Sequence, residues 1–223
     1  MADPWKRKEV IGDCVLYQGD CLEVMPTLGT VDAVVTDPPY GLGKRMQGGT
    51  WGTKGNYAKM REWDMTTNQT AFDMLYGFGV PVICWGGNYY DVPPSRCWLI
   101  WAKRDNMPTM SDFEMAWTNL DRNSKEFSHP RSGFDRAHQT GKPVVLMEWC
   151  LGFLPAAETI LDPFMGSGTT LVACAKLGRK GIGIELDPDY FDIACKRVEE
   201  AYRQPDLFIE KPKPQPKQEG FDL

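Results

Sequence analysis

The sequence predicts an α/β domain built on a doubly wound, largely parallel β-sheet. Short β-branched runs such as Ala33–Thr36 have the continuous apolar character of strands buried on both faces. These runs alternate along the chain with segments of helical period, and two of them end in loops rich in glycine or proline. A chain of 223 residues, 42% of them hydrophobic, suits one such domain.

The predicted elements place residues 1–202 in a single domain. Strands are expected over residues 14–18, 33–36, 80–85, 97–101, 112–117, 159–161 and 181–184. Helices are expected just after residue 20, over 143–154, from the glycine-rich segment to Gly178, and through a last segment that buries Phe191, Ala194, Val198 and Ala201. Residues 41–68 and 122–139 are predicted to be polar loops, and the proline- and lysine-rich residues 203–223 a tail without a core.

Composition narrows the class of protein. A net charge of −5 argues against a generally basic surface, yet one loop concentrates positive charge that is predicted to contact phosphate, at Lys44, Arg45, Lys54, Lys59 and Arg61. The chain has no apolar run long enough to span a membrane and no apolar stretch of a signal peptide at its start, so a cytoplasmic location is expected. Seven scattered cysteines without Cys-x-x-Cys spacing predict reduced, mostly buried thiols and no metal site.

The strand at 159–161 runs into a glycine-rich segment, Asp162 to Thr170. Glycines let backbone amides approach a ligand, and the first turn of the following helix offers unpaired N–H groups to a carboxylate or a phosphate. The segment is not the dinucleotide-binding Gly-x-Gly-x-x-Gly, because Leu171 takes the third glycine's place, and it lacks the Gly-Lys-Ser/Thr of a phosphate loop. The next strand ends in Glu185, whose carboxylate suits the two hydroxyls of a ribose.

A second loop, Asp37-Pro38-Pro39-Tyr40, follows the strand at 33–36 directly. Its prolines fix φ and leave carbonyl groups without a local N–H partner. Asp37 and the Pro38 carbonyl are therefore able to accept both hydrogens of one amino group, and the Tyr40 ring offers a surface on which a planar base can stack. Ligands of doubly wound sheets bind beyond the carboxyl ends of the strands, where both loops are expected to meet.

These motifs resemble those of the DNA amino-methyltransferases, which methylate adenine N6 or cytosine N4 with S-adenosylmethionine. Asp37-Pro38-Pro39-Tyr40 is similar to the family's catalytic motif, and Asp162-Pro163-Phe164-x-Gly166-Ser167-Gly168-Thr169 to its cofactor motif. His138-x-x-x-Lys142-Pro143 resembles the segment that precedes the cofactor motif, and Gly19-Asp20 the contact to the cofactor's adenine. The catalytic motif comes first, as in the β subclass, and the small size resembles solitary enzymes of phages and prophages.

The resemblance implies a Rossmann-like sheet of seven strands, one of them antiparallel, and a role for each matched residue. Asp37, Pro38, Pro39 and Tyr40 are then the catalytic residues, acting on a base flipped out of double-stranded DNA. The cofactor-binding residues are Asp20, Lys142, Asp162, Phe164, Gly166, Ser167, Gly168, Thr169, Thr170 and Glu185, with Lys142 and the glycine segment at the methionine end. His138 is expected to orient its loop.

Several alternatives stay open at this point. Adenine N6 is favoured because an aspartate at the head of the catalytic motif is commoner among the adenine enzymes, with cytosine N4 the nearest rival. More distant readings are an RNA or protein-glutamine methyltransferase and a DNA-binding regulator without turnover. The short recognition loops imply a short recognition sequence or a homodimer. Gln204–Phe208 resembles peptides that dock on bacterial sliding clamps, and a restriction partner is left open.

Overall fold

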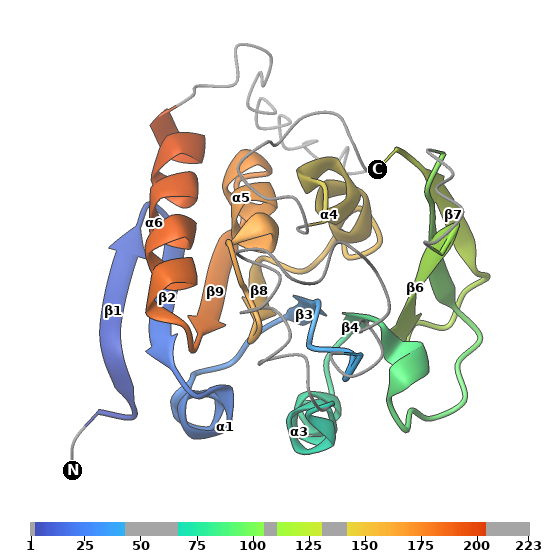
Figure 1. Ribbon diagram of the computed structural model, residues 1–223, viewed down its shortest axis with the longest axis horizontal. Coiled ribbons are helices and arrows are strands. Elements are labelled where there is room, and N and C mark those ends of the chain that lie inside the picture. Colours follow the sequence, from blue (N-terminus) through green and yellow to red (C-terminus); the bar gives the residue numbers. More distant parts are fainter. Residues whose placement is uncertain (1–2, 43–66, 105–110, 131–141, 204–223) are drawn as a thin grey trace, which may run out of the picture.

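A single nine-stranded sheet runs through the computed structural model, which describes residues 3–42, 67–104, 111–130 and 142–203 (Figure 1). Its strands lie in the order β1-β2-β9-β8-β3-β4-β6-β5-β7. Their bounds are β1 Trp5–Ile11, β2 Cys14–Gly19, β3 Ala33–Thr36, β4 Val82–Trp85, β5 Trp98–Ala102, β6 Phe113–Thr118, β7 Lys125–Ser128, β8 Thr159–Asp162 and β9 Lys180–Glu185.

The centre of the sheet is parallel and its margins are mixed. Strands β2, β9, β8, β3 and β4 pair in parallel, β6 is antiparallel to both β4 and β5, and β1 is antiparallel to β2. The predicted fold class is confirmed, but the expected count of seven strands is wrong. The two additional strands are the edges β1 and β7, whose largely exposed, charge-rich sequences carry no buried-strand pattern.

Helices cover both faces of the sheet, as a doubly wound fold requires. On one face lie α4 (Val144–Leu151), α5 (Thr169–Lys176) and α6 (Pro188–Arg203), and on the other α1 (Cys21–Val24) and α3 (Gln69–Gly77) (Figure 1). Neighbouring residues of β3 divide between these layers. Val35 packs in the core with residues of α4 and α5, whereas Val34 packs with residues of α1 and α3.

Most predicted boundaries agree with the observed elements. The predicted helix at 143–154 is α4, for which Pro143 is the N-cap residue, and the helix expected to end at Gly178 is α5, since Gly178 follows its C-cap with φ +65°. The prediction of an irregular loop over 122–139 is wrong for residues 125–128, which form β7 in parallel with β5. Helix α3 was not predicted.

The seven cysteines are all free thiols, six of them buried, as expected.

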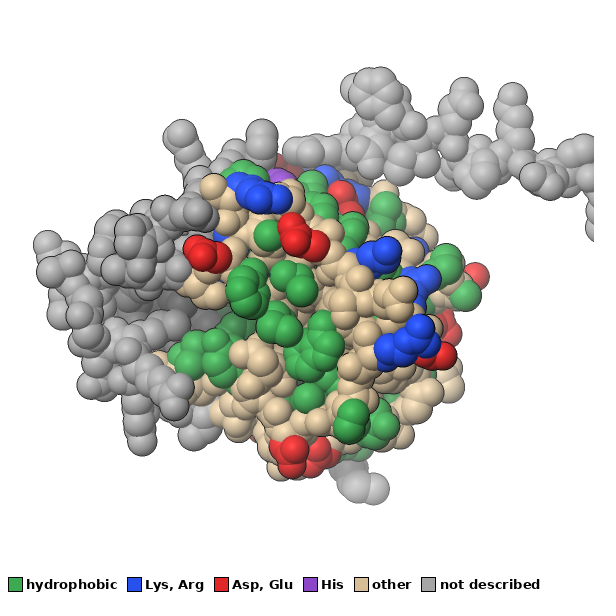
Figure 2. All heavy atoms as spheres, turned by 90° about the vertical axis from the view of Figure 1, so that its right-hand side faces the viewer, with side chains coloured by type: hydrophobic (Ala, Val, Ile, Leu, Met, Phe, Trp, Pro, Cys, Tyr) green, Lys and Arg blue, Asp and Glu red, His purple; other side chains and the backbone are tan. Residues whose placement is uncertain are grey.

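Of the described helices, none has the length and apolar character that crossing a membrane requires. Hydrophobic side chains gather near the centre of the face turned toward the right-hand side of Figure 1 (Figure 2). Phe113, on β6, is half exposed.

Candidate active site

Four carboxylates lie at the carboxyl ends of four neighbouring parallel strands. Asp20 follows β2, Glu185 ends β9, Asp162 ends β8, and Asp37 follows β3; the strand order β2-β9-β8-β3 sets these residues along one edge. The predicted meeting of the glycine segment with the Asp37 loop is confirmed, because β8 and β3 are paired. A buried contact ties the two strand ends together: Thr36 Oγ1 donates a hydrogen bond of 2.8 Å to Asp162 Oδ1.

The glycine segment makes a tight left-handed turn into α5. Gly166 and Gly168 have φ of +51° and +79°, a region that favours glycine, and Gly168 is the N-cap residue of α5. A side chain at Gly166 would meet no atom within 4 Å, so this side of the turn is open to a ligand. Arg197, on α6, donates hydrogen bonds of 2.7 Å to the carbonyl and to the hydroxyl of Ser167, and one of 3.2 Å to Thr169 Oγ1. The hydrogen bonds of Arg197 therefore fix the turn against α6.

Replacing Gly168 by alanine is expected to lower the free energy of unfolding by about 2 kcal/mol, because a Cβ there combines positive φ with close contact. That atom would lie 3.0 Å from the Cβ of Ala194. Gly178 is a matched control, with φ +65° and no atom within 4 Å of an added Cβ, so Gly178→Ala measures the backbone strain alone. Chemical denaturation of both variants checks this. Equal losses would mean that packing against α6 contributes nothing.

Glu185 has the acceptor geometry expected of a ribose-binding residue. Its Oε2 accepts a hydrogen bond of 2.9 Å from the Gly166 amide, and its Oε1 one of 2.8 Å from the Asp187 amide. Each oxygen keeps a second lone pair for a hydroxyl group. Burial raises the pKa of Glu185 to about 7, although these amide hydrogen bonds oppose the rise. Asp20 caps α1 at the neighbouring strand end, accepting a bond of 2.9 Å from the Leu22 amide with Oδ1.

Asp162 and Thr170 support the glycine segment from within the core. Burial raises the pKa of Asp162 to about 6, against the effect of hydrogen bonds from Thr170, Thr36 and the Phe164 amide. Asp162 is 3% exposed, so it supports the glycine segment through hydrogen bonds within the core. Phe164 is half-buried and packs against the core cluster that includes Ile184.

The Asp37 loop is held rigidly through its tyrosine. Tyr40 donates a hydrogen bond of 2.6 Å from its hydroxyl to Asp37 Oδ1, and its ring stacks on Tyr89 with centroids 5.0 Å apart. Gly86 lies so close to this ring that an added Cβ would come within 2.0 Å of it. Tyr90 donates a bond of 2.6 Å to the Pro39 carbonyl. Among the described residues, neither Asp37 Oδ2 nor the Pro38 carbonyl has a hydrogen-bond partner.

Lys142, which the resemblance assigns to the methionine end of the cofactor, contacts this loop. Its ammonium group forms an ion pair with Asp37 Oδ1, donates a bond of 2.8 Å to the Tyr40 hydroxyl and lies 3.2 Å from Glu114 Oε2. Burial alone would lower the pKa of Lys142, but the carboxylates of Asp37 and Glu114 raise it. The structure therefore links Lys142 to the catalytic motif.

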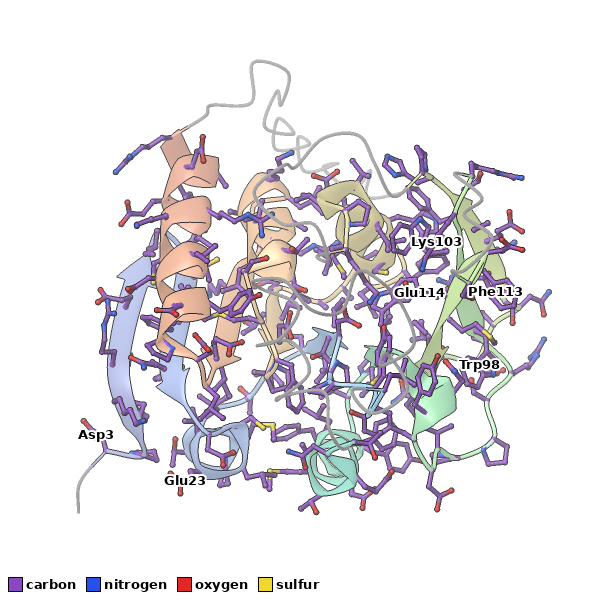
Figure 3. All side chains as sticks on the ribbon, viewed as in Figure 1. Asp3, Glu23, Trp98, Lys103, Phe113 and Glu114 are labelled. Atoms are coloured by element: carbon purple, nitrogen blue, oxygen red, sulfur yellow. The ribbon has the colours of Figure 1, made fainter. Side chains whose placement is uncertain are left out.

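Sequence reasoning missed Glu114 and Lys103. Glu114 forms an ion pair with Lys103, and the two side chains lie beside each other at β6 in Figure 3. A carboxylate within the otherwise apolar run Phe113-Glu114-Met115-Ala116-Trp117 was the signal available, because buried strands rarely carry an acid without a partner.

The remaining sequence predictions divide into two groups. Trp101 and Trp117, in tryptophan-rich strands, are core residues, and Trp98 is half-buried against the core. Other predicted residues lie outside the described part of the chain: Lys44, Arg45, Lys54, Lys59, Arg61, His138 and Gln204–Phe208.

One edge of the doubly wound sheet carries the glycine turn, the carboxylate of Glu185 suited to ribose hydroxyls, and the Asp37-Pro38-Pro39-Tyr40 loop. This combination is that of a Rossmann-like methyltransferase. Comparison with known proteins agrees. A family model described as DNA methylase matches residues 91–196. The type II methyltransferase M.ScaI of Streptomyces caespitosus is 26% identical over 84% of this chain and 82% of its own length.

Two solved structures share the fold. The complex of M1.HpyAVI with S-adenosylmethionine has a TM-score of 0.51 at 24% identity and covers 82% of this chain and 98% of its own. The cytosine-N4-specific PvuII DNA methyltransferase has a TM-score of 0.57 at 15% identity, with coverage of 89% and 95%. The family model and the type II relatives support an S-adenosylmethionine-dependent DNA amino-methyltransferase of the N6/N4 family.

Proposed function

We propose that this DNA methyltransferase acts on adenine N6 of a base flipped out of duplex DNA. The observation that supports the proposal is which acceptors of the Asp37 loop already have hydrogen-bond partners. Asp37 Oδ1 is taken by Lys142 and Tyr40, while Oδ2 and the Pro38 carbonyl have no partner among the described residues. Two acceptors beside each other in the sequence, with the carboxylate fixed in orientation, match the two hydrogens of an exocyclic amino group.

The cofactor half of the site fits S-adenosylmethionine. Glu185 would accept the ribose hydroxyls, Asp20 would accept from the adenine amino group, and the amides around Gly166 and Gly168 at the start of α5 would hold the methionine carboxylate. The hydroxyls of Ser167 and Thr169 are engaged with Arg197, so their backbone is the part expected to face the ligand. When bound, the cofactor supplies an electrophilic methyl group.

Asp37 and the Pro38 carbonyl would activate the target amino group by accepting both of its hydrogens. The nitrogen lone pair, otherwise delocalised into the ring, would then be available to attack the methyl group that the bound cofactor would supply, and the S–C electron pair would stay with the sulfur of the leaving thioether. The nitrogen is briefly cationic and loses one proton to Asp37, which passes it to solvent. Flipping costs a few kcal/mol, and stacking of the base against the Tyr40–Tyr89 pair would return roughly 1–3 kcal/mol.

Adenine is favoured over cytosine by the aspartate that heads the catalytic loop, whereas the fold accommodates both. The solved relative named as cytosine-N4-specific has the same fold. The test is mass spectrometry of nucleosides from the DNA of a host that lacks its own methyltransferases and expresses this chain. We expect N6-methyladenine. N4-methylcytosine alone would overturn the choice of base and retain the site.

Replacing Glu185 by glutamine is expected to weaken S-adenosylmethionine binding by about 10- to 100-fold, because hydrogen bonds to a charged acceptor contribute ~1.5–3 kcal/mol. The pH dependence follows from the raised pKa of about 7. The ionised form accepts both hydroxyls, so affinity of the wild type should fall as pH drops below 7, by up to tenfold per pH unit. Calorimetry between pH 5.5 and 8.5 checks this, and the Glu185→Gln variant should lose the pH dependence. An unchanged slope in the variant would assign the titration to another group.

A further inference from the structure

Four charged side chains, two of them buried lysines and two of them partly exposed carboxylates, alternate in sign beside the catalytic loop. Lys142 contacts both Asp37 and Glu114, and Glu114 contacts Lys103. The two lysine side chains are 6% and 8% exposed and the Glu114 side chain 26% exposed. Coulomb interactions are screened little at such depth, so the position of each charge matters to its neighbours. We name these residues, Asp37, Lys142, Glu114 and Lys103, the charge quartet.

Glu114 and Lys142 are held in their charged forms at neutral pH. Burial would raise the pKa of Glu114, but the ammonium groups of Lys142 and Lys103 outweigh it and lower the pKa to about 2. Two lysines and two carboxylates sum to zero charge. The thiols nearest to Lys142 stay protonated, since burial raises the pKa of both Cys84, on β4, and Cys150, on α4, far above neutrality.

Glu114 acts on Asp37 only through intermediates. It lies 3.2 Å from Lys142 Nζ and accepts a long hydrogen bond of 3.4 Å from the Tyr40 hydroxyl, and these two groups are the ones that occupy Asp37 Oδ1. Glu114 comes from the antiparallel strand β6, outside both sequence motifs. Glu114 therefore contacts both of the groups that hold Asp37 Oδ1.

We propose that Glu114 is a positioning residue for methyl transfer, which aligns Asp37 through Lys142 and Tyr40 and balances the charge of Lys142 beside the reacting nitrogen. The inference rests on the proposed role of Asp37. A nitrogen that becomes cationic is stabilised by a neutral or negative surrounding and opposed by a positive one. Glu114→Gln leaves two lysines and one carboxylate, a net charge of +1 at this position.

The Glu114→Gln variant is expected to transfer methyl groups roughly 10- to 100-fold more slowly in single turnovers, with cofactor affinity unchanged. The deficit should shrink as pH rises from 7 to 10, because a lysine facing fewer carboxylates loses its proton more easily and restores neutrality. Glu114→Asp should recover part of the rate. Glu126→Gln is the matched control: it removes the same charge from β7, which β5 separates from β6, and there Glu126 pairs with Arg104 at the surface.

A double variant, Glu114→Gln with Lys103→Met, returns the cluster to zero charge and should recover most of the rate, which a purely structural role would not produce. If the single variant does not fold, the methyl-transfer rate of the double variant still tests the role of the Glu114 charge. The inference is overturned if Glu114→Gln keeps the wild-type rate and pH profile, or if its loss is independent of pH and neither Glu114→Asp nor the double variant recovers it. A wild-type rate in Asp37→Ala would refute the proposed function itself. Sensitivity to Asp37→Ala with no effect of Glu114→Gln would refute only the role of Glu114.

Discussion

Replacing Asp37 by alanine is expected to slow methyl transfer by at least about 10²–10³-fold, the usual cost of losing one preorganised polar contact to the reacting group. Asp37 supplies one of the two acceptors proposed for the target amino group, and its Oδ2 has no hydrogen-bond partner among the described residues. Glu185 and the glycine segment are untouched by the change, so S-adenosylmethionine affinity should stay at the wild-type value. Single-turnover transfer of a labelled methyl group to unmethylated duplex DNA measures the rate, and calorimetry measures the affinity.

Asp32→Ala is the matched control for this experiment. Asp32 precedes the opposite end of β3 and accepts hydrogen bonds of 3.0 and 2.8 Å from the amides of Glu158 and Thr159. Its loss should reduce stability and leave the rate per folded molecule unchanged. An Asp37→Ala variant as fast as the Asp32→Ala variant would remove Asp37 from the chemistry.

Replacing Lys142 by methionine is expected to lower the free energy of unfolding by about 3 kcal/mol at neutral pH, because it leaves two carboxylates facing each other without their shared cation. The Asp37 side chain is 32% exposed, which keeps the expected loss at the lower end of the range for buried pairs. Lys176→Met is the control. Lys176 pairs with Glu148 at 3.4 Å on the surface, where such a pair contributes less than about 1 kcal/mol.

The pH dependence of this loss follows from Glu114. Its pKa in the folded protein, about 2, lies below the ordinary 4.5, so its ionisation stabilises the fold above pH 4.5 and this contribution is lost as pH falls toward 2. Without Lys142 the pKa of Glu114 rises. The difference between wild type and Lys142→Met should therefore be complete at neutral pH and narrow as the solution is acidified. Denaturation curves at several pH values check both statements; a difference that widens in acid would contradict the ion-pair explanation.

The sequence predicted the parts of the fold that are buried on both faces. The run Ala33–Thr36 and the glycine segment combine hydrophobic period with residues that only a turn explains, so the central strands and the active-site edge were accessible. The edge strand at Lys125–Ser128 was not, because three of its four side chains are exposed and it exists through pairing with β5. Pairing partners distant in sequence leave no local signal.

Some residues of the candidate site could likewise be predicted from the sequence and others could not. The positions of Asp37, Asp162 and Glu185 could be predicted because each lies at or just after the end of a recognisable strand. Lys142 was singled out by its motif, but its contacts with Asp37 and Tyr40 were not predicted, since a long side chain reaches in a direction that sequence does not specify. Glu114 lies 77 positions after Asp37, on a strand that runs against its neighbours, and only the folded sheet brings the two within reach of one lysine.

The most direct test of this account is a crystal structure with S-adenosylhomocysteine, the demethylated product of the cofactor. We expect its ribose hydroxyls on the Glu185 carboxylate, its amino-acid end at the amides around Gly166 and Gly168, and Asp37 still paired with Lys142. A ligand bound elsewhere, or with its ribose away from Glu185, would contradict the assignment of this edge of the sheet as the active site.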